Sequence, residues 1–200
     1  MGEIKVTRDA GGIPGLTLIE PKVFGDERGY FIEAFNARDY RKAGIDVDFV
    51  QDNESMSCRG VLRGLHFQIN YPQDKLVRAM SGEIYDVAVD LRPDSPTFGK
   101  HFGVILSGEN KRQLFVPKNF AHGFVVRSET AVFCYKVTDY YHPDDEGGIA
   151  FDDATLGVDW ALPEGFGKSD LILSAKDRVN PSFADWCQSR DIPYESKTAG

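Results

Sequence analysis

Apolar and polar residues alternate over short stretches along most of the chain, and segments rich in glycine, proline or asparagine separate these stretches. Such alternation is typical of β-strands, and the turn residues at 93–96 and 107–110 mark reversals of the chain. No long segment has the 3.6-residue period of an amphipathic helix. The pattern predicts strands at 16–19, 30–35, 60–68, 75–80, 85–91, 102–106, 113–116, 124–126 and 131–137.

The order of these elements indicates the fold class. Strands at this spacing, without helices between them, favour a sandwich or barrel over a parallel α/β sheet. We therefore predict an all-β fold in one domain spanning residues 1–200, because no linker, repeat or low-complexity segment divides the chain. Short helices are expected at 39–43 and 182–190. From about residue 160 onward we expect an irregular C-terminal segment.

Charge and cysteine content restrict the partners and the cellular compartment. Acidic residues outnumber basic ones, 31 against 23, and the formal net charge is −8. An acidic surface repels nucleic acids and anionic membranes, so we expect neither as a partner. The three cysteines are isolated, as in reduced cytosolic proteins. The sequence contains neither a secretion signal nor an apolar run of transmembrane length, and we expect a cytoplasmic protein.

The stretch 60–68 is unusual because it places Arg63, His66 and Gln68 inside an apolar frame. Burial of such groups is costly unless each finds a partner. In a regular strand His66 and Gln68 share one face, and Arg63 points the other way. Gly64 lies between them and is a candidate β-bulge that turns Arg63 and His66 toward one cavity. A core histidine with satisfied hydrogen bonds is the alternative.

Several titratable residues lie in apolar β surroundings on separate predicted strands. A histidine takes up a proton near neutral pH, and a neighbouring carboxylate orients its ring. A lysine stabilises a developing oxyanion, and a tyrosine returns a proton from another side. Together these groups suit removal of a proton next to a carbonyl group, followed by reprotonation. The residues are His66, Lys75, Asp86, His122, Tyr135 and Asp177.

A metal site is the competing use of these histidines. Metal-binding jelly rolls often carry a His-x-His pair, but Gln68 stands where the second histidine would be. His66 and His122, with Gln68 and Glu83, make a poor transition-metal set. No phosphate-binding glycine loop or dinucleotide fingerprint occurs either. We therefore expect no metal and no organic cofactor.

The sequence closely resembles the dTDP-4-dehydrorhamnose 3,5-epimerases. The matching segments run collinearly from about residue 16 to residue 177: 24–29, 50–53, 60–68, 75–78, 82–90, 95–99, 106–117, 120–124, 135–136 and 174–177. The resemblance implies a cupin-type jelly roll, usually a homodimer, with a dTDP-4-keto-6-deoxy sugar as substrate. It also implies a cofactor-independent reaction that inverts carbons 3 and 5 of dTDP-4-dehydro-6-deoxyglucose.

The same resemblance implies roles for individual residues. His66 matches the proton acceptor and Asp177 its partner. Tyr135 matches the proton donor, and Lys75 the residue beside the enolate oxygen. Tyr141 matches the aromatic residue that stacks on the thymine, with Tyr140 as the alternative. The other matching positions bind the sugar nucleotide: Arg28, Glu33, Gln51, Asp52, Asn53, Arg63, His122, Glu146 and Lys176. Of these, we expect Arg28 and Arg63 to bind the diphosphate.

Alternatives remain open at this point. An epimerase that inverts only one carbon needs the same base and acid. A sugar-nucleotide binding module and a metal-dependent cupin oxygenase belong to other classes. The segments 161–173 and 186–200 depart from the family pattern, so their roles are undecided. For the homodimer, the strand at 16–19 is the candidate to join the edge of a partner's sheet.

Overall fold

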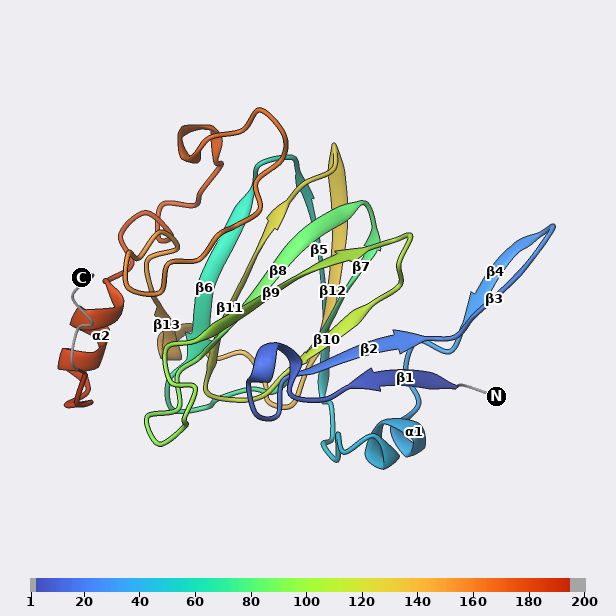
Figure 1. Cartoon of the computed structure of the whole chain (residues 1–200), viewed down its shortest axis with the longest axis horizontal. Coiled ribbons are helices and arrows are strands. Elements are labelled where there is room, and N and C mark those ends of the chain that lie inside the picture. The colour runs from blue at the N-terminus through green and yellow to red at the C-terminus, as the bar shows by residue number, and fades with distance from the viewer. Residues whose placement is uncertain (1–2, 195–200) are drawn as a thin grey trace.

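The computed structural model describes residues 3–194, and nearly all of its regular elements are strands (Figure 1). Three short 3₁₀ helices occur at Ala10–Gly12, Pro143–Asp145 and Lys168–Asp170. The expected all-β architecture is therefore confirmed. The other elements are β1 (Ile4–Thr7), β2 (Thr17–Pro21), β3 (Val23–Asp26), β4 (Gly29–Ile32), α1 (Ala37–Lys42), β5 (Gln51–Cys58), β6 (Leu62–Gln68), β7 (Lys75–Ser81), β8 (Glu83–Asp90), β9 (His101–Ser107), β10 (Gln113–Val116), β11 (Phe120–Val126), β12 (Thr130–Val137), β13 (Glu146–Gly148) and α2 (Phe183–Ser189).

Two antiparallel sheets form the body of the molecule. The six-stranded sheet has the order β1-β2-β10-β7-β12-β5, and the five-stranded sheet has the order β13-β6-β11-β8-β9. Successive strands alternate between the two sheets from β5 to β8 and again from β9 to β12, while β8 and β9 are neighbours in one sheet. This is the jelly-roll arrangement. Residues far apart in the chain therefore face one another between the sheets.

The main core lies between the sheets. Ile84 and Leu106 from one sheet and Leu114 from the other have no exposed surface. The rings of Phe124 and Phe133, also one from each sheet, lie 4.3 Å apart at their centroids. Burial of large apolar side chains contributes about 1.5–3 kcal/mol each, and this core holds the two sheets in register.

The C-terminal segment forms a third layer against the outer face of the five-stranded sheet. Leu65 and Val87 point outward from the sheet, yet they are fully buried against residues such as Ile149 and Phe183. The strand β8 is consequently buried on both faces, and its Asp86 has no exposed surface. An alternating pattern normally leaves the polar side solvated, but here that side faces the interior.

The N-terminal region differs from the sequence prediction. The predicted strand at 16–19 corresponds to β2, but β2 is paired on one side with β1 and on the other with β10. The hypothesis that it joins a partner's sheet edge is therefore wrong, because both of its hydrogen-bonding edges are occupied within the chain. The strand predicted at 30–35 is also too long, since β4 ends at Ile32.

The hairpin β3–β4 projects away from both large sheets (Figure 1). It exposes Val23, Phe24, Tyr30 and Phe31, the last with 67% of its surface accessible. After the hairpin, α1 begins two residues before its predicted start because the Asn36 side chain accepts a hydrogen bond from the backbone N–H of Arg38.

Candidate active site

A β-bulge in β6 brings Arg63 and His66 to one cavity, as predicted. His66 pairs with His122 and Arg63 with Phe124, so β6 contains one extra residue between these pairs. Gly64 lies in this interval with a φ of +140°, and a Cβ atom there would lie 2.6 Å from the Cα of Gly123. Only glycine fits both the dihedral angle and the close approach.

The cavity has a volume of about 610 Å³ and is lined by strands from both sheets and by residues 172–177. It brings together most of the predicted site residues. The segment at 161–173 also reaches it through Ile172 and Leu173. The predicted residues that line the cavity are Asn53, Arg63, His66, Lys75, His122, Tyr135, Tyr141, Glu146, Lys176 and Asp177.

His66 and Asp177 form a close pair in this cavity. His66 Nε2 lies 2.5 Å from Asp177 Oδ1, and Asp177 is only 3% exposed. Burial raises the pKa of Asp177, but hydrogen bonds from His66 and Ser174 outweigh that effect and the net pKa is lowered. An ionised Asp177 orients the ring and stabilises an imidazolium. Because Nε2 is engaged, Nδ1 is the nitrogen left to take a proton.

Lys75 lies near a second buried pair. Burial lowers the pKa of Lys75 to about 8, while the charges of Asp86 and Glu146 act in the opposite direction. His122 Nε2 is 3.0 Å from each carboxylate oxygen of Asp86. Asp86 was noted in the sequence as titratable but received no role. Its signal was a charged residue within the apolar run 84–89.

Tyr135 approaches the cavity from the six-stranded sheet, whereas His66 belongs to the five-stranded sheet. Burial raises the pKa of the Tyr135 phenol, and Arg63 partly offsets this. The phenol therefore stays protonated at neutral pH. The site thus presents a histidine with a carboxylate partner and a protonated phenol on different walls, a pairing that suits acid–base chemistry.

Polar groups surround the rest of the cavity. Arg63 donates hydrogen bonds to the Ser57 hydroxyl from Nε at 3.3 Å and from Nη2 at 3.1 Å. Glu146 accepts hydrogen bonds from Lys176 and from the Tyr141 hydroxyl, the latter at 3.1 Å. Tyr140, by contrast, is 62% exposed and does not line the cavity.

Four predicted site residues lie outside this cavity. Arg28 is at the tip of the projecting hairpin, where it pairs with Asp26. The Glu33 carboxylate accepts a hydrogen bond from Asn36. The Gln51 amide donates to the Asn53 side chain at 2.8 Å. The fourth, Asp52, pairs with Lys136.

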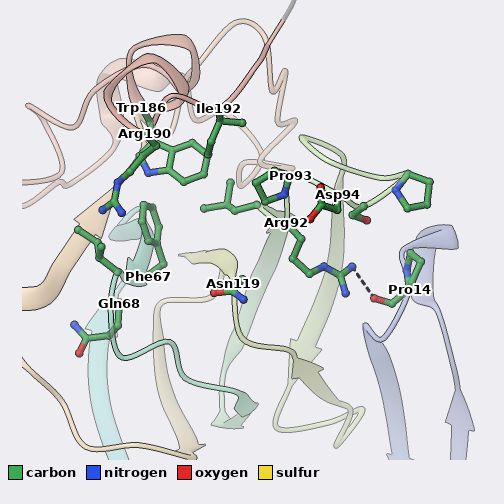
Figure 2. Close-up of a pocket in the computed structure, with 14 residues that line it drawn as sticks. Pro14, Phe67, Gln68, Arg92, Pro93, Asp94, Asn119, Trp186, Arg190 and Ile192 are labelled. Carbon is green, nitrogen blue, oxygen red and sulfur yellow. Dashed lines mark hydrogen bonds between the residues drawn. The ribbon is translucent and has the colours of Figure 1, made fainter.

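A larger cavity of about 770 Å³ lies beside α2, and its lining includes Phe67 and Gln68 of β6 as well as Trp186 and Arg190 (Figure 2). The tail from residue 186 reaches this cavity rather than the first one, and residues 195–200 lie outside the described part of the chain. Among residues 3–194, its lining contains no histidine, lysine or tyrosine. In that part of the chain it therefore differs from the first cavity, which is lined by all three residue types.

The position of Gln68 bears on the metal alternative. Its amide nitrogen donates to the backbone carbonyl of His142, and its oxygen accepts from the His142 backbone N–H. Within residues 3–194, no three histidine, cysteine or acidic side chains are grouped to hold a metal ion.

In the same residues, no helix has the length and apolar character needed to span a membrane.

Comparison with known proteins connects this geometry to a family. The family model described as dTDP-4-dehydrorhamnose 3,5-epimerase matches residues 11–185. The chain belongs to this family. It is 54% identical over 181 residues to the dTDP-4-dehydrorhamnose 3,5-epimerase of Methanothermobacter thermautotrophicus, with 90% of this chain and 93% of that protein covered.

Solved structures of this epimerase family have the same fold. One is dTDP-6-deoxy-D-glucose-3,5-epimerase from Legionella pneumophila in complex with dTDP-4-keto-L-rhamnose, with a TM-score of 0.86, 48% identity, and coverage of 96% of this chain and 100% of that chain. Another is a double mutant of ChmJ, a 3'-monoepimerase from Streptomyces bikiniensis, in complex with dTDP. It has a TM-score of 0.80 and 28% identity, and the match covers 89% of this chain and 88% of that chain.

Family membership confirms the predicted resemblance and the cupin-type jelly roll. It makes the chain an isomerase-class enzyme, and it favours the epimerase interpretations over a binding module or an oxygenase. Ser174 and Asp86 contact predicted site residues, but neither of them was assigned a role from the sequence. Their hydrogen bonds are visible only once Asp177 and His122 have been placed.

Proposed function

We propose that this protein inverts carbons 3 and 5 of dTDP-4-dehydro-6-deoxyglucose and produces dTDP-4-dehydro-L-rhamnose. The His66–Asp177 pair, in one cavity with Lys75 and Tyr135, supports this most directly. Both carbons are adjacent to the ketone at carbon 4, so one base and one acid suit both inversions. The family match and the sugar nucleotide named for the Legionella structure support the substrate.

The proposed reaction begins at His66. Its Nδ1 removes the hydrogen next to the ketone, and the electron pair of that C–H bond moves to the ketone oxygen as an enolate. Asp177 stabilises the imidazolium that forms, and the Lys75 ammonium stabilises the enolate oxygen. Tyr135 then protonates the same carbon from the opposite face. Exchange with solvent returns a proton to the phenolate and removes one from the imidazolium.

Incubation with the 4-keto sugar nucleotide in deuterated water tests this function. We expect deuterium at carbon 3 and at carbon 5, because each inversion replaces a carbon-bound hydrogen with one from solvent. Label at only one carbon would identify a single-carbon epimerase. The ChmJ relative, a 3'-monoepimerase, makes this the second candidate function. Absence of label at both carbons would contradict both candidates.

Arg63 is proposed to bind the nucleotide diphosphate, since its only partner among residues 3–194 is the neutral Ser57 hydroxyl. Arg63→Ala should weaken dTDP binding by about 10- to 100-fold, the range for loss of charge-assisted hydrogen bonds. The loss should shrink at high salt. Titration calorimetry measures both effects. Arg59→Ala is the control, because Arg59 is exposed nearby but does not line the cavity.

The titration of Lys75 should produce an alkaline limb in kcat/KM. Activity is expected to fall as the pH rises through about 8, because the ammonium that stabilises the enolate is lost. Asp86→Asn removes a negative charge that holds the Lys75 proton, so the limb should move to lower pH. A pH profile of both proteins measures this shift. An unchanged limb would exclude Lys75 as its source.

We further propose a homodimer in which the β3–β4 hairpin packs against the partner. A two-stranded hairpin with four exposed apolar side chains is marginally stable alone, and a partner surface would cover them. Arg28 at the tip of the hairpin and Glu33, which follows the end of β4, would then reach the partner's cavity. This arrangement accounts for their absence from the cavity of their own chain.

Light scattering is expected to give the mass of two chains at micromolar concentration. Phe31→Asp should shift the protein toward the monomer, because a buried unpaired carboxylate disfavours the interface. Val179→Asp is the matched control, since Val179 is also apolar and is 79% exposed outside the hairpin. A monomeric wild-type protein, or equal effects of both substitutions, would contradict the proposed interface.

A cytoplasmic location is likewise proposed, supported by three free cysteines.

A further inference from the structure

Both oxygens of the Asp177 carboxylate have a partner, one within the turn formed by residues 174–177 and the other on β6. The Ser174 hydroxyl donates to Asp177 Oδ2 at 2.7 Å and accepts from the Asp177 backbone N–H at 3.2 Å. The other oxygen, Oδ1, contacts His66. The carboxylate therefore bridges the proposed base and a hydroxyl group that neither family membership nor the proposed mechanism assigns.

A second turn in the chain has the same geometry without the base. Ser182 donates to Asp185 Oδ2 at 2.6 Å and accepts from the Asp185 backbone N–H at 3.1 Å. There the motif caps α2 and Asp185 is exposed to solvent. The Ser-x-x-Asp turn is thus a local structure in both places, but only the first presents its carboxylate to a catalytic histidine.

The location of the first turn relative to β6 is fixed by the backbone. The Ile172 N–H donates to the Gly60 carbonyl at 2.9 Å, and the Leu62 N–H donates to the Ile172 carbonyl at 3.1 Å. These bonds attach the segment to the start of the strand that carries His66. Within that segment, the Ser174 hydroxyl contacts the Asp177 oxygen that does not contact His66.

We propose that Ser174 is a positioning residue of the epimerisation reaction: its hydroxyl orients Asp177 so that Asp177 engages Nε2 of His66 and directs Nδ1 toward the substrate. This inference rests on the proposed function, because it assumes that His66 is the base. Ser174 acts through Asp177 and has no direct contact with the reacting carbon in this mechanism.

The electrostatic consequence separates this role from a structural one. The hydrogen bond from Ser174 is one of the interactions that keep the pKa of Asp177 low, after burial and the His66 contact. Without it, the pKa of Asp177 is lowered less, so the His66–Asp177 pair keeps its shared proton to higher pH. The acid limb of kcat/KM should then move to higher pH, whereas a purely structural defect leaves that limb in place.

The experiment measures kcat, KM and the pH profile with the 4-keto sugar nucleotide. Ser174→Ala should lower kcat by about 10- to 100-fold with little change in KM, a range typical of misplaced catalytic groups. Its acid limb should shift upward. Ser174 is exposed, so this truncation leaves the core intact. Ser182→Ala, which removes the same hydrogen bonds at α2, should leave kcat and the profile unchanged.

A pair of isosteric variants keeps the inference testable if shape alone affects the turn. Ser174→Thr retains the hydroxyl and Ser174→Val replaces it with a methyl group, so the threonine variant should be substantially more active. Equal activity of the two, or a loss in Ser174→Ala without a shifted acid limb, would overturn the inference. Wild-type deuterium incorporation is measured in parallel. If wild type incorporates none, it is the proposed function that fails.

Discussion

Replacement of His66 by alanine should abolish epimerisation and deuterium incorporation together. Hydrogens next to a ketone are weak acids, and His66, held by the ionised Asp177, is the proposed base that removes them. Since general-base catalysis and the steps that depend on it are lost, we expect a fall of about 10³-fold or more in kcat. Mass spectrometry of the sugar nucleotide in deuterated water follows both processes.

The control for this substitution is His101→Ala. His101 begins the edge strand β9 and lines neither cavity, so its loss should leave the rate within twofold of wild type, about the scale of surface substitutions. Deuterium incorporation at the normal rate in His66→Ala would show that another group removes the proton. The assignment of β6 as the catalytic strand would then be wrong.

Replacement of Tyr135 by phenylalanine should separate two processes that His66→Ala abolishes together. His66 can still remove the proton and return one to the same face, so exchange should persist. Inversion requires a proton on the opposite face and should slow by about 10²- to 10⁴-fold, the usual contribution of a general acid. The ratio of exchange to inversion, measured in one reaction, reports this difference directly.

Tyr140→Phe is the matched control because Tyr140 is exposed and does not line the cavity. It should leave both rates near wild type. Full epimerase activity in Tyr135→Phe would instead require another donor, such as a bound water or the Tyr141 hydroxyl. That hydroxyl already donates to Glu146, so it would first have to leave this partner.

The sequence was most informative where one face of a strand had to be buried. The strand prediction at 113–116 coincides with β10, and the bulge at Gly64 was expected from a glycine between two polar residues. Strand β1 was missed because Ile4–Thr7 is only four residues long and half of its side chains are exposed. A short edge strand gains its stability from the neighbouring β2, which a local pattern does not contain.

Site residues were predictable as partners only where the family resemblance paired them. The resemblance supplied His66 and Asp177 as a pair, and the structure places them in contact. The link between Asp86 and His122 depends on adjacent strands β8 and β11, a pairing that no local spacing reveals. For Arg28 the resemblance implied a role at the substrate, but the fold puts Arg28 on the β3–β4 hairpin, away from the cavity of the same chain.

The outer layer determines when the proposed site is completed during synthesis on the ribosome. Asp177 follows His66 by 111 residues and belongs to the segment that packs on the five-stranded sheet last in chain order. All strands of both sheets are synthesised before it. A nascent chain that has just completed β13 therefore carries His66 without Asp177, so the proposed base gains its counter-ion only after both sheets have been synthesised.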